Sequence, residues 1–359
     1  MLKARAAVRA LPAYHPPLGG RKGLRLDFNE NTVGCSPRVL ERLRQTNLED
    51  LARYPEREPA ERAVGEFMGV TPEEILLTNG VDEAIHLVCE TYLEPDDEAL
   101  IVIPTFSMYK IYAAATGANV VEIPAGHNFQ FPTDEVLRRI TDRTRLIAVA
   151  NPNNPTGTLA PLDDLLQIAH HAPAAAILID EAYAEFSGQT LLTRWRETPN
   201  LFVARTFSKA YGMAGLRIGV LLGNPEQIRF VRLVSSPYSV NSIALACLPD
   251  ALADQEFIRQ YVNEVREGRA RLEDTLKANA IPYWPSQANF VLARYGSQKF
   301  VQSMKQRGIL VRDRSSDHGC EGCVRITVGP REHTDRLLGA LQETLQELGL
   351  AQGQGVARS

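Results

Sequence analysis

The stretch "RTFSKAYGMAGLRIG", residues 205–219, places Lys209 next to Ser208 and puts Arg217 eight positions later. It links two apolar runs, 201–206 and 217–223, that are typical of buried strands. A lysine so close to a protein core is costly unless its amine is paired or used chemically. The stretch therefore predicts a functional lysine at the end of a strand, and the rest of the sequence must indicate which group this lysine binds or reacts with.

Seven short runs rich in β-branched and apolar residues occupy the middle of the chain, with helix-like segments between most of them. Most of the runs are apolar throughout rather than alternating, which is how strands buried on both faces of a mainly parallel sheet read. The runs lie at 75–79, 99–104, 119–124, 145–150, 175–180, 201–206 and 217–223. We therefore predict an α/β fold whose large domain has three layers around a mainly parallel seven-stranded sheet.

The pattern changes after about residue 250. A long charged helix is predicted over 254–279, followed by strands at 289–293, 308–312 and 324–328 and a last helix over 331–348. These elements predict a smaller α+β domain, and we expect segment 36–45 to pack with it. The predicted bounds are 1–44 for an N-terminal arm with part of the small domain, 45–250 for the large domain, 251–350 for the small domain and 351–359 for a disordered tail.

Composition narrows the class of partner. The 359 residues carry a formal net charge of −4, so a nucleic-acid partner is not expected. No apolar run reaches the roughly 18 residues that span a bilayer, so we expect no membrane partner either. The first 26 residues lack Asp and Glu, as transit peptides do, but they also lack Ser and contain three prolines. We expect an arm packed on the protein or on a partner subunit.

Five cysteines, an odd number, do not make a disulfide framework and fit a reducing, cytoplasmic location. The segment "HGCEGC", 318–323, invites a metal interpretation through His318, Cys320 and Cys323. Zinc needs about four protein ligands, and no second Cys or His pair lies nearby in the sequence. We interpret these residues as loop cysteines and expect no metal.

Polar residues gather where the predicted strands end, which is where open α/β sheets bind ligands. The run at 75–79 leads into a helix that begins at Gly80, Val81 and Asp82, whose free amides would bind an anion. The segments "TFSMY", "NPNNPTG", "DEAYAEF" and "TFSKAYG" follow other strands. Each has an ordinary explanation as a turn or a helix cap. Together they predict one ligand site, formed by Tyr109, Asn154, Asp180, Tyr183, Thr206, Ser208 and Lys209.

In order and spacing these motifs resemble the fold-type I aminotransferases, which use pyridoxal phosphate. The family's "NPTG" asparagine, "D-x-x-Y" pair, "S/T-x-S-K" lysine and following arginine correspond to Asn154, to Asp180 with Tyr183, to Lys209 and to Arg217. The resemblance implies pyridoxal phosphate as the cofactor, with Lys209 as its Schiff-base lysine and as the general base. It also implies that Asp180 keeps the ring nitrogen protonated, so that the ring acts as an electron sink.

The same resemblance implies how the remaining residues hold the cofactor. Tyr183 and Asn154 would hydrogen-bond the phenolic oxygen, and Tyr109 would stack on the ring. The cofactor phosphate would be held by the start of a helix, two hydroxyls and a guanidinium. These phosphate-binding residues are Gly80, Val81, Asp82, Thr206, Ser208 and Arg217.

A finer resemblance, over nearly the whole chain, is to the histidinol-phosphate aminotransferases, through "LDFNENTVGCSP", "LARYPE", "PTFSMY", "GILVRD" and "CVRITVG". It implies a homodimer in which Tyr54 reaches the neighbouring active site. It also implies that Arg312 and Arg325 bind substrate anions, together with Asn29 and Tyr14. One pocket would have to accept both the phosphate of histidinol phosphate and the carboxylates of glutamate.

The predicted activity is amino-group transfer between L-histidinol phosphate and 2-oxoglutarate, giving imidazole acetol phosphate and L-glutamate, as in histidine biosynthesis. Two other activities fit the same scaffold: an aromatic or broad-specificity aminotransferase, and a decarboxylase of a phosphorylated amino acid such as threonine phosphate. A non-catalytic cofactor sensor is disfavoured, because the sequence has neither a spare segment nor a basic face for a DNA-binding module.

Overall fold

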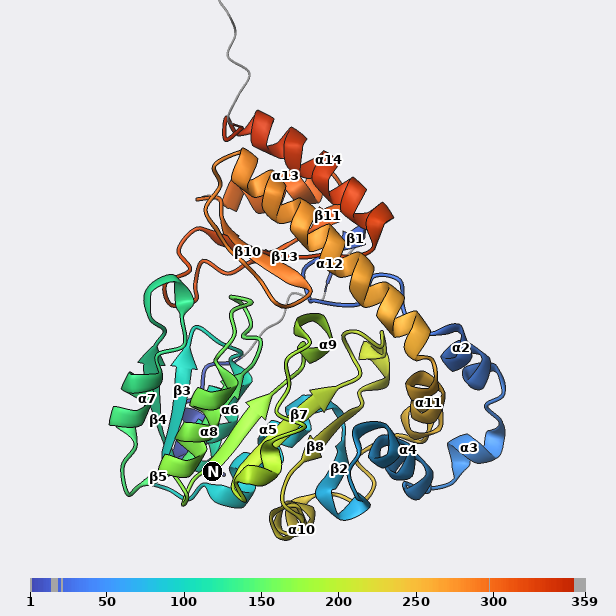
Figure 1. The fold of residues 1–359 in the computed structure, drawn as a ribbon, viewed down its shortest axis with the longest axis vertical. Coiled ribbons are helices and arrows are strands. Elements are labelled where there is room, and N and C mark those ends of the chain that lie inside the picture. The colour runs from blue at the N-terminus through green and yellow to red at the C-terminus, as the bar shows by residue number, and fades with distance from the viewer. Residues whose placement is uncertain (1, 14–18, 21, 297, 352–359) are drawn as a thin grey trace, which may run out of the picture.

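The computed structural model describes residues 2–13, 19–20, 22–296 and 298–351. A seven-stranded sheet forms its centre, in the order β2-β8-β7-β6-β5-β3-β4 (Figure 1). Strand β8 is antiparallel to both of its neighbours, and the other pairs are parallel. The strands are β2 (Ile75–Thr78), β3 (Glu98–Ile103), β4 (Asn119–Pro124), β5 (Thr144–Ala150), β6 (Ala176–Asp180), β7 (Leu201–Thr206) and β8 (Gly219–Leu222). The predicted α/β class and mainly parallel sheet are confirmed.

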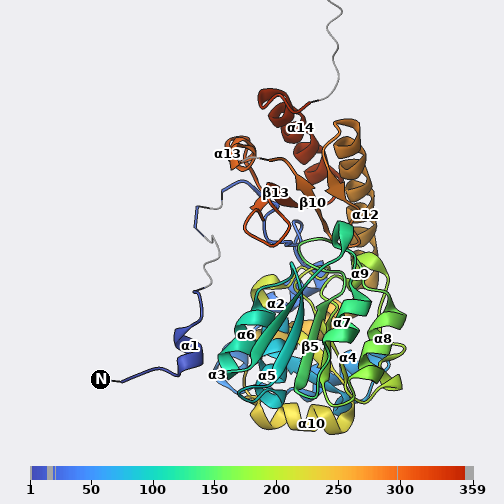
Figure 2. The same ribbon diagram turned by 90° about the vertical axis from the view of Figure 1, so that its left-hand side faces the viewer.

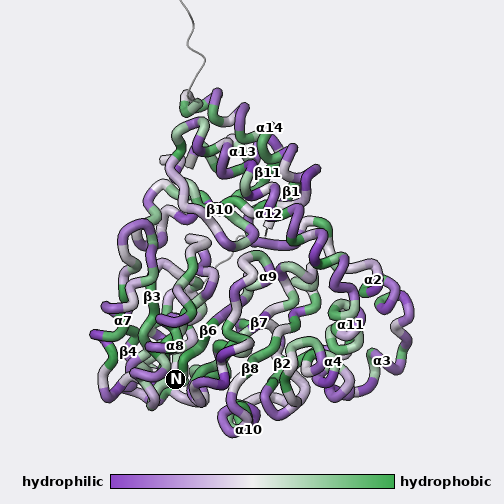
Figure 3. The backbone as a smooth tube through the Cα atoms, in the orientation of Figure 1, coloured by the Kyte–Doolittle hydropathy of each residue, from purple (hydrophilic) through white to green (hydrophobic). Residues whose placement is uncertain are grey.

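Helices cover both faces of this sheet, which explains why most of its strands are apolar throughout. In β6, Ile177 and Ile179 enter one core cluster, whereas Ala176 and Leu178 enter the other. Successive side chains of a strand point to opposite faces. Figure 2 shows the two helical layers, and the central strands are green in Figure 3. One layer contains α5 (Gly80–Tyr92), α6 (Met108–Thr116) and α10 (Pro225–Val234); the other contains α4 (Glu58–Met68), α7 (Thr133–Arg139), α8 (Leu162–His171), α9 (Ala184–Ser187) and α11 (Ser242–Ala253).

A second, smaller unit lies above the carboxyl ends of the strands, joined to the first by the long helix α12 (Gln255–Ala278) (Figure 1). Its antiparallel sheet has the order β12-β13-β10-β9. Gly268 lets α12 approach α14, because a Cβ there would lie 2.5 Å from Thr334 Oγ1. The remaining elements are β9 (Tyr283–Trp284), β10 (Phe290–Arg294), α13 (Gln298–Gln306), β12 (Arg312–Asp313), β13 (Cys323–Thr327) and α14 (Arg331–Glu347).

The strand predicted at 308–312 is divided in two. β11 (Ile309–Leu310) pairs in parallel with β1 (Leu24–Arg25), whereas β12 joins the antiparallel sheet through Arg312 and Asp313. The first part of the chain is therefore tied to the small unit by a two-residue strand. A stretch this short has no periodicity from which its pairing could be predicted.

The segment 36–45 differs from the expectation. It forms α2 (Pro37–Arg44), which packs on α11 of the large unit rather than on the small one. The N-cap residue Ser36 donates a hydrogen bond from its hydroxyl to Asp254, at the start of α12. Two short helices, α1 (Ala6–Arg9) and α3 (Leu48–Ala52), complete the N-terminal part.

The domain bounds 1–44, 45–250 and 251–350 stay a prediction, and the tail predicted at 351–359 lies outside the described residues apart from Ala351. Among the helices that the structure describes, none has the length and apolar character needed to cross a membrane.

Candidate active site

A cavity of about 260 Å³ lies between the carboxyl ends of the large sheet and the small unit. Its walls come from the strand ends of the large sheet with the turns and helix starts that follow them, from the segment after β1, and from β12, β13 and the residue after β12. Most of the predicted site residues line it: Asn29, Val81, Asp82, Tyr109, Asn154, Asp180, Tyr183, Thr206, Ser208, Lys209, Arg217, Arg312 and Arg325. Residues that were not predicted also contribute, among them Asp27, Phe28, Glu30, Phe106 and Arg314.

Lys209 follows β7, and its Nζ donates a hydrogen bond to the carbonyl oxygen of Phe28 at 3.1 Å. Burial, together with the positive charge of Arg325, lowers the pKa of Lys209 to about 8. Burial penalises the charged ammonium, and a nearby cation adds to that penalty. Lys209 therefore has a minor but reactive fraction of neutral, nucleophilic amine near neutral pH, where an ordinary lysine would be almost wholly charged.

Asp180 ends β6 and faces the cavity as a buried carboxylate. It accepts hydrogen bonds from the hydroxyl of Tyr109 at 2.6 Å and from the amide of Ala182 at 3.0 Å. Burial raises the pKa of Asp180 to about 6, although the Tyr109 hydrogen bond opposes the rise. Asp180 is thus predominantly ionised at neutral pH and can pair with a cationic ring nitrogen. The Tyr109–Asp180 contact was not predicted from the sequence; stacking of Tyr109 on a ring stays a prediction.

A group of residues that could bind an anion, here called the cradle, lies where α5 begins. Arg217, in a left-handed conformation just before β8, donates to the carboxylate of Asp82 at 2.9 Å. Gly80 lies beneath this guanidinium, and a Cβ there would lie 2.6 Å from Arg217 Nη2. Gly80 therefore belongs to the cradle without lining the cavity itself. Helix amides, a guanidinium and hydroxyls are the groups that bind phosphate.

The hydroxyls of the cradle come from the turn after β7. Thr206 accepts a hydrogen bond from the amide of Ser208 at 3.1 Å. The Ser208 hydroxyl is buried and has no hydrogen-bond partner among the described residues. A buried hydroxyl without a partner is costly, so this atom indicates a ligand at the position predicted for the phosphate.

Tyr183 and Asn154 lie in a network that joins the two units. Asn29 donates from Nδ2 to the hydroxyl of Tyr183 at 2.9 Å, and Arg325 donates from Nη1 to Oδ1 of Asn154 at 2.5 Å. Burial raises the pKa of Tyr183, and the charge of Arg325 partly opposes this. Arg325 thus contacts a residue predicted to bind the cofactor.

Three arginines face the cavity from the small unit. Arg325 donates to the carbonyl oxygen of Asp27 at 2.7 Å, while its buried Nε has no partner among the described residues. The guanidinium of Arg312 lies 5.3 Å from the centre of the Phe28 ring. Arg314, which was not predicted, forms an ion pair with Asp317. The strand predicted from the sequence ended at 312, and β12 ends at Asp313, so the strand pattern gave no signal for Arg314.

Two predicted residues are not placed in the cavity. The side chain of Tyr54 is 77% exposed and packs against Tyr238, with 4.3 Å between the ring centres. Because it lies outside this chain's own site, its predicted role in a neighbouring subunit stays a prediction. Tyr14 lies outside the described residues.

Residues 21–341 match the family described as "Aminotransferase class I and II". The chain belongs to the class I and II aminotransferases. Among proteins of this family, it is 33% identical to a histidinol-phosphate aminotransferase of Geobacillus sp. (strain WCH70), over 96% of this chain and 99% of that protein. It is 36% identical to the histidinol-phosphate aminotransferase of Caldanaerobacter subterraneus subsp. tengcongensis, over 89% and 93% of the two chains.

The fold of this aminotransferase also matches solved structures. The crystal structure of histidinol-phosphate aminotransferase from Sinorhizobium meliloti, in complex with pyridoxal-5'-phosphate, superposes with a TM-score of 0.87 at 25% identity. The match covers 97% of this chain and 99% of that one. The resemblance inferred from the motifs is confirmed, and so is the prediction that the protein is an aminotransferase.

Proposed function

We propose that this aminotransferase uses pyridoxal phosphate to transfer the amino group between L-histidinol phosphate and 2-oxoglutarate, giving imidazole acetol phosphate and L-glutamate. The observation that carries the proposal is that the two ends of one cavity carry different chemical groups. Lys209 and the carboxylate of Asp180 lie at its sheet end, and Arg312 and Arg325 lie at the end formed by the small unit. The relatives named histidinol-phosphate aminotransferase, which match along most of the chain, support the choice of substrate.

The residues present fit pyridoxal phosphate group by group. The orphaned Ser208 hydroxyl, Arg217 and the start of α5 form a phosphate cradle in which Gly80 leaves no room for a Cβ. Asp180 supplies the buried negative charge for the ring nitrogen, and Lys209 supplies an amine with a lowered pKa for the aldehyde. Tyr183 and Asn154 offer hydrogen bonds for the phenolic oxygen.

When bound, pyridoxal phosphate supplies an electron sink for the electrons of the substrate's broken α C–H bond. The protein's part is to hold charges and to move protons. The Nζ of Lys209 takes the proton from the substrate α-carbon, and its pKa near 8 suits a base that works near neutral pH. Asp180 keeps its negative charge under the ring because Tyr109 and the Ala182 amide stabilise the ionised form.

The arginines at the other end select for anionic substrates. Histidinol phosphate presents a phosphate and glutamate presents carboxylates, and a guanidinium binds either of them through two parallel hydrogen bonds. Among the described residues, the Nε of Arg325 and that of Arg314 have no hydrogen-bond partner, so these donors are available to such an anion. The pocket therefore accepts both substrates in turn, through the same groups.

We also infer that the protein acts as a homodimer. Tyr54 and Tyr238 pack together on the surface with 77% and 59% of their side chains exposed, and Leu48 and Leu51 in the neighbouring helix α3 are 84% and 64% exposed. A patch of large apolar side chains in contact with solvent is typical of a protein interface. In such a dimer Tyr54 is available to the partner's site.

A half-reaction screen tests the proposed function. The holoenzyme is mixed with one amine at a time, and the absorbance change as the cofactor takes up the amino group is followed. We expect histidinol phosphate and glutamate to react, and phenylalanine, tyrosine and threonine phosphate to react much more slowly. Faster reaction with an aromatic amino acid, or release of carbon dioxide from threonine phosphate, would favour one of the two alternative activities. Borohydride should fix the cofactor to Lys209, and a label on another lysine would contradict the assignment.

A further inference from the structure

The segment "HGCEGC", 318–323, has no role in the proposed function, yet the structure brings its two cysteines together. The amide of Cys323 donates a hydrogen bond to the carbonyl oxygen of Cys320 at 2.8 Å, which closes a β-turn. The first and last Cα atoms of such a turn lie within about 7 Å. A disulfide joins residues whose Cα atoms are about 4.4–6.8 Å apart. The backbone of this turn therefore already has a span that suits a disulfide.

The turn is held in place by the end of β10. The carbonyl oxygen of Gly322 accepts hydrogen bonds from the amides of Tyr295 and Gly296, at 2.9 and 3.0 Å. Gly322 has a φ of +71°, and a Cβ at this position would lie 2.9 Å from the Cα of Gly296. The two cysteines are therefore presented by a defined turn rather than by a loose loop.

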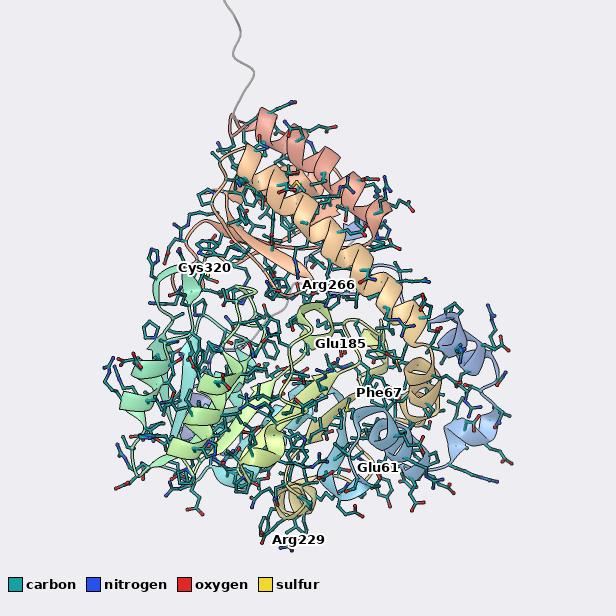
Figure 4. All side chains as sticks on the ribbon, viewed as in Figure 1. Glu61, Phe67, Glu185, Arg229, Arg266 and Cys320 are labelled. Carbon is teal, nitrogen blue, oxygen red and sulfur yellow. The ribbon has the colours of Figure 1, made fainter. Side chains whose placement is uncertain are left out.

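Both cysteines are buried where the two units meet. They form a small cluster with Leu292, against which Phe129 and Trp284 pack. Phe129 comes from the segment between β4 and α7 of the large unit and Trp284 from β9, with 4.8 Å between the ring centres. Figure 4 shows Cys320 at this junction, while His318 and Glu321 on either side of it are exposed.

Cys323 differs from the other cysteines in its electrostatics. A hydrogen bond from Cys320 and the guanidinium of Arg294 lower the pKa of Cys323, whereas the pKa of Cys320 is raised. Burial raises the pKa of Cys89 to about 12 and that of Cys247 to about 11. Because the thiolate is the nucleophile in disulfide exchange, Cys323 is the favoured attacking group.

We propose that Cys320 and Cys323 are a redox-active pair that forms an intramolecular disulfide by exchange with a small-molecule disulfide. Cys323 sulfur attacks one sulfur of that molecule, forming a mixed disulfide and releasing one thiol. Cys320 sulfur then attacks the sulfur of Cys323 and releases the second thiol. The two cysteines lose two electrons and two protons, and the small disulfide takes them up as it becomes two thiols.

The position of the pair connects this bond to the substrate end of the cavity. The amide of Arg314 donates to the carbonyl oxygen of Cys323 at 2.9 Å, and Arg325 follows Cys323 by two residues in β13. Arg312 lies opposite Arg325 in the strand pairing. Closing the disulfide therefore acts on the segment that carries all three arginines. We expect a change in KM for the anionic substrate with little change in cofactor binding. This expected effect on KM rests on the proposed function, whereas formation of the disulfide does not.

The bond is tested on the full-length folded protein, without any activity assay. The protein is equilibrated in glutathione buffers from fully reduced to fully oxidised, quenched in acid, unfolded with an alkylating reagent and digested for mass spectrometry. The expected result is a peptide containing residues 320–323 whose mass is lower by two hydrogens and whose cysteines are not alkylated. Treatment with dithiothreitol should restore the two hydrogens and make both cysteines reactive to the alkylating reagent. If both cysteines are alkylated even after equilibration in the most oxidised buffer, the proposal is wrong.

Two variants sharpen the result. In the Cys320→Ser variant the reaction should stop at the mixed disulfide between Cys323 and one glutathione. The Cys89→Ser variant, which changes a buried cysteine in α5, should still form the disulfide between Cys320 and Cys323. A disulfide that pairs Cys323 with another cysteine in the native protein would overturn the proposal.

The oxidised and the reduced wild-type protein should differ in KM for histidinol phosphate by about fivefold or more. A disulfide that forms with KM unchanged would disprove the link to the arginines, whereas absence of transamination in both forms would count against the proposed function instead.

Discussion

The sheet end of the cavity and the end formed by the small unit are assembled in different ways. At the sheet end, Asp180 and Thr206 are the last residues of β6 and β7, which pair in parallel, and Lys209 follows β7. At the other end, distant segments meet: the amide of Asn29 donates to the Thr327 hydroxyl, 298 residues away in the sequence, at 3.0 Å. The reacting groups are thus fixed by the pairing of strands within one sheet. The anion-binding groups are fixed by packing between distant parts of the chain.

This difference implies that changes at the sheet end act mainly on the chemical step, whereas changes at the arginine end act mainly on substrate binding. Arg325 is the exception that connects the ends, because it contacts Asn154 and also lowers the pKa of Lys209. Five predictions test this division.

The largest effect is expected for Lys209→Ala, which removes the base from the sheet end. We expect kcat to fall by three orders of magnitude or more, about 4 kcal/mol, because no other amine takes the proton from the substrate. Steady-state rates with histidinol phosphate measure this loss. Lys110→Ala is a suitable control, since Lys110 is exposed and pairs with Glu122. A Lys209→Ala enzyme within tenfold of the wild type would contradict the assignment.

Asp180→Asn keeps the shape of the side chain and removes its charge. We expect kcat to fall by roughly a hundred- to a thousandfold, because an amide cannot hold a protonated ring nitrogen as a carboxylate does. Tyr109→Phe is the matched comparison, since it removes one hydrogen bond to Asp180 and leaves the charge. Its effect should be about tenfold. Equal losses in the two variants would show that the charge of Asp180 is not the important property.

The pH dependence of cofactor attachment tests the connection between the two ends. The pKa of Lys209 is lowered from its ordinary 10.5 to about 8, so the amine is protonated and unreactive below pH 8 and neutral above it. The attachment rate in the cofactor-free protein should rise about tenfold per pH unit up to about 8 and then level off. Stopped-flow absorbance measures it. Arg325→Gln removes a charge that lowers this pKa and should move the midpoint to higher pH; an unchanged midpoint would refute the coupling.

Arg325→Ala should raise KM for both histidinol phosphate and glutamate, because each presents an anion to the same guanidinium. A charged hydrogen bond contributes about 1.5–3 kcal/mol, so we expect kcat/KM to fall about ten- to a hundredfold for each substrate. Arg331→Ala, which changes an exposed arginine at the start of α14, serves as the control. If only one substrate is affected, the anions do not share a site.

The smallest effect is expected for Arg314→Gln, at the arginine that is already paired with Asp317. We expect KM for histidinol phosphate to rise about three- to tenfold and KM for glutamate to change less, because a phosphate dianion gains more from a third cation than a carboxylate does. Measuring KM for both substrates decides this. An equal rise in KM for both substrates would show that Arg314 attracts anions in general and does not recognise the phosphate.

The sheet end can be predicted from the sequence because its rules are local. Continuously apolar runs mark strands buried on both faces, and the polar residues after each run must meet at one edge. These rules alone bring Asp180, Asn154 and Lys209 to the same edge of the sheet. They do not provide the hydrogen bond from Tyr109 to Asp180, because the direction of a helical side chain depends on how α6 packs on the sheet.

The other end is less predictable, for physical reasons. Arg312 and Arg325 are identified only through the family resemblance, and Arg314, which lies just beyond the end of β12, was missed. The division of 308–312 into two short strands depends on the partners of each half, β1 and β13, of which β1 lies far away in the sequence. Local patterns contain no information about such pairings.

The pairing of Leu24 with Ile309 has a consequence for the order in which the protein is made. At about 5–20 residues per second, a ribosome that has added Leu24 needs roughly 15–60 s to add the next 285 residues, up to and including Ile309. In the last part of that interval, once β8 (Gly219–Leu222) has been made, the large sheet can form while the segment at 24–29 still lacks its partner strand. The nascent chain thus holds Lys209 and Asp180 in place before Asn29 and the arginines arrive, so an incomplete chain would possess the reacting groups without the means to choose a substrate.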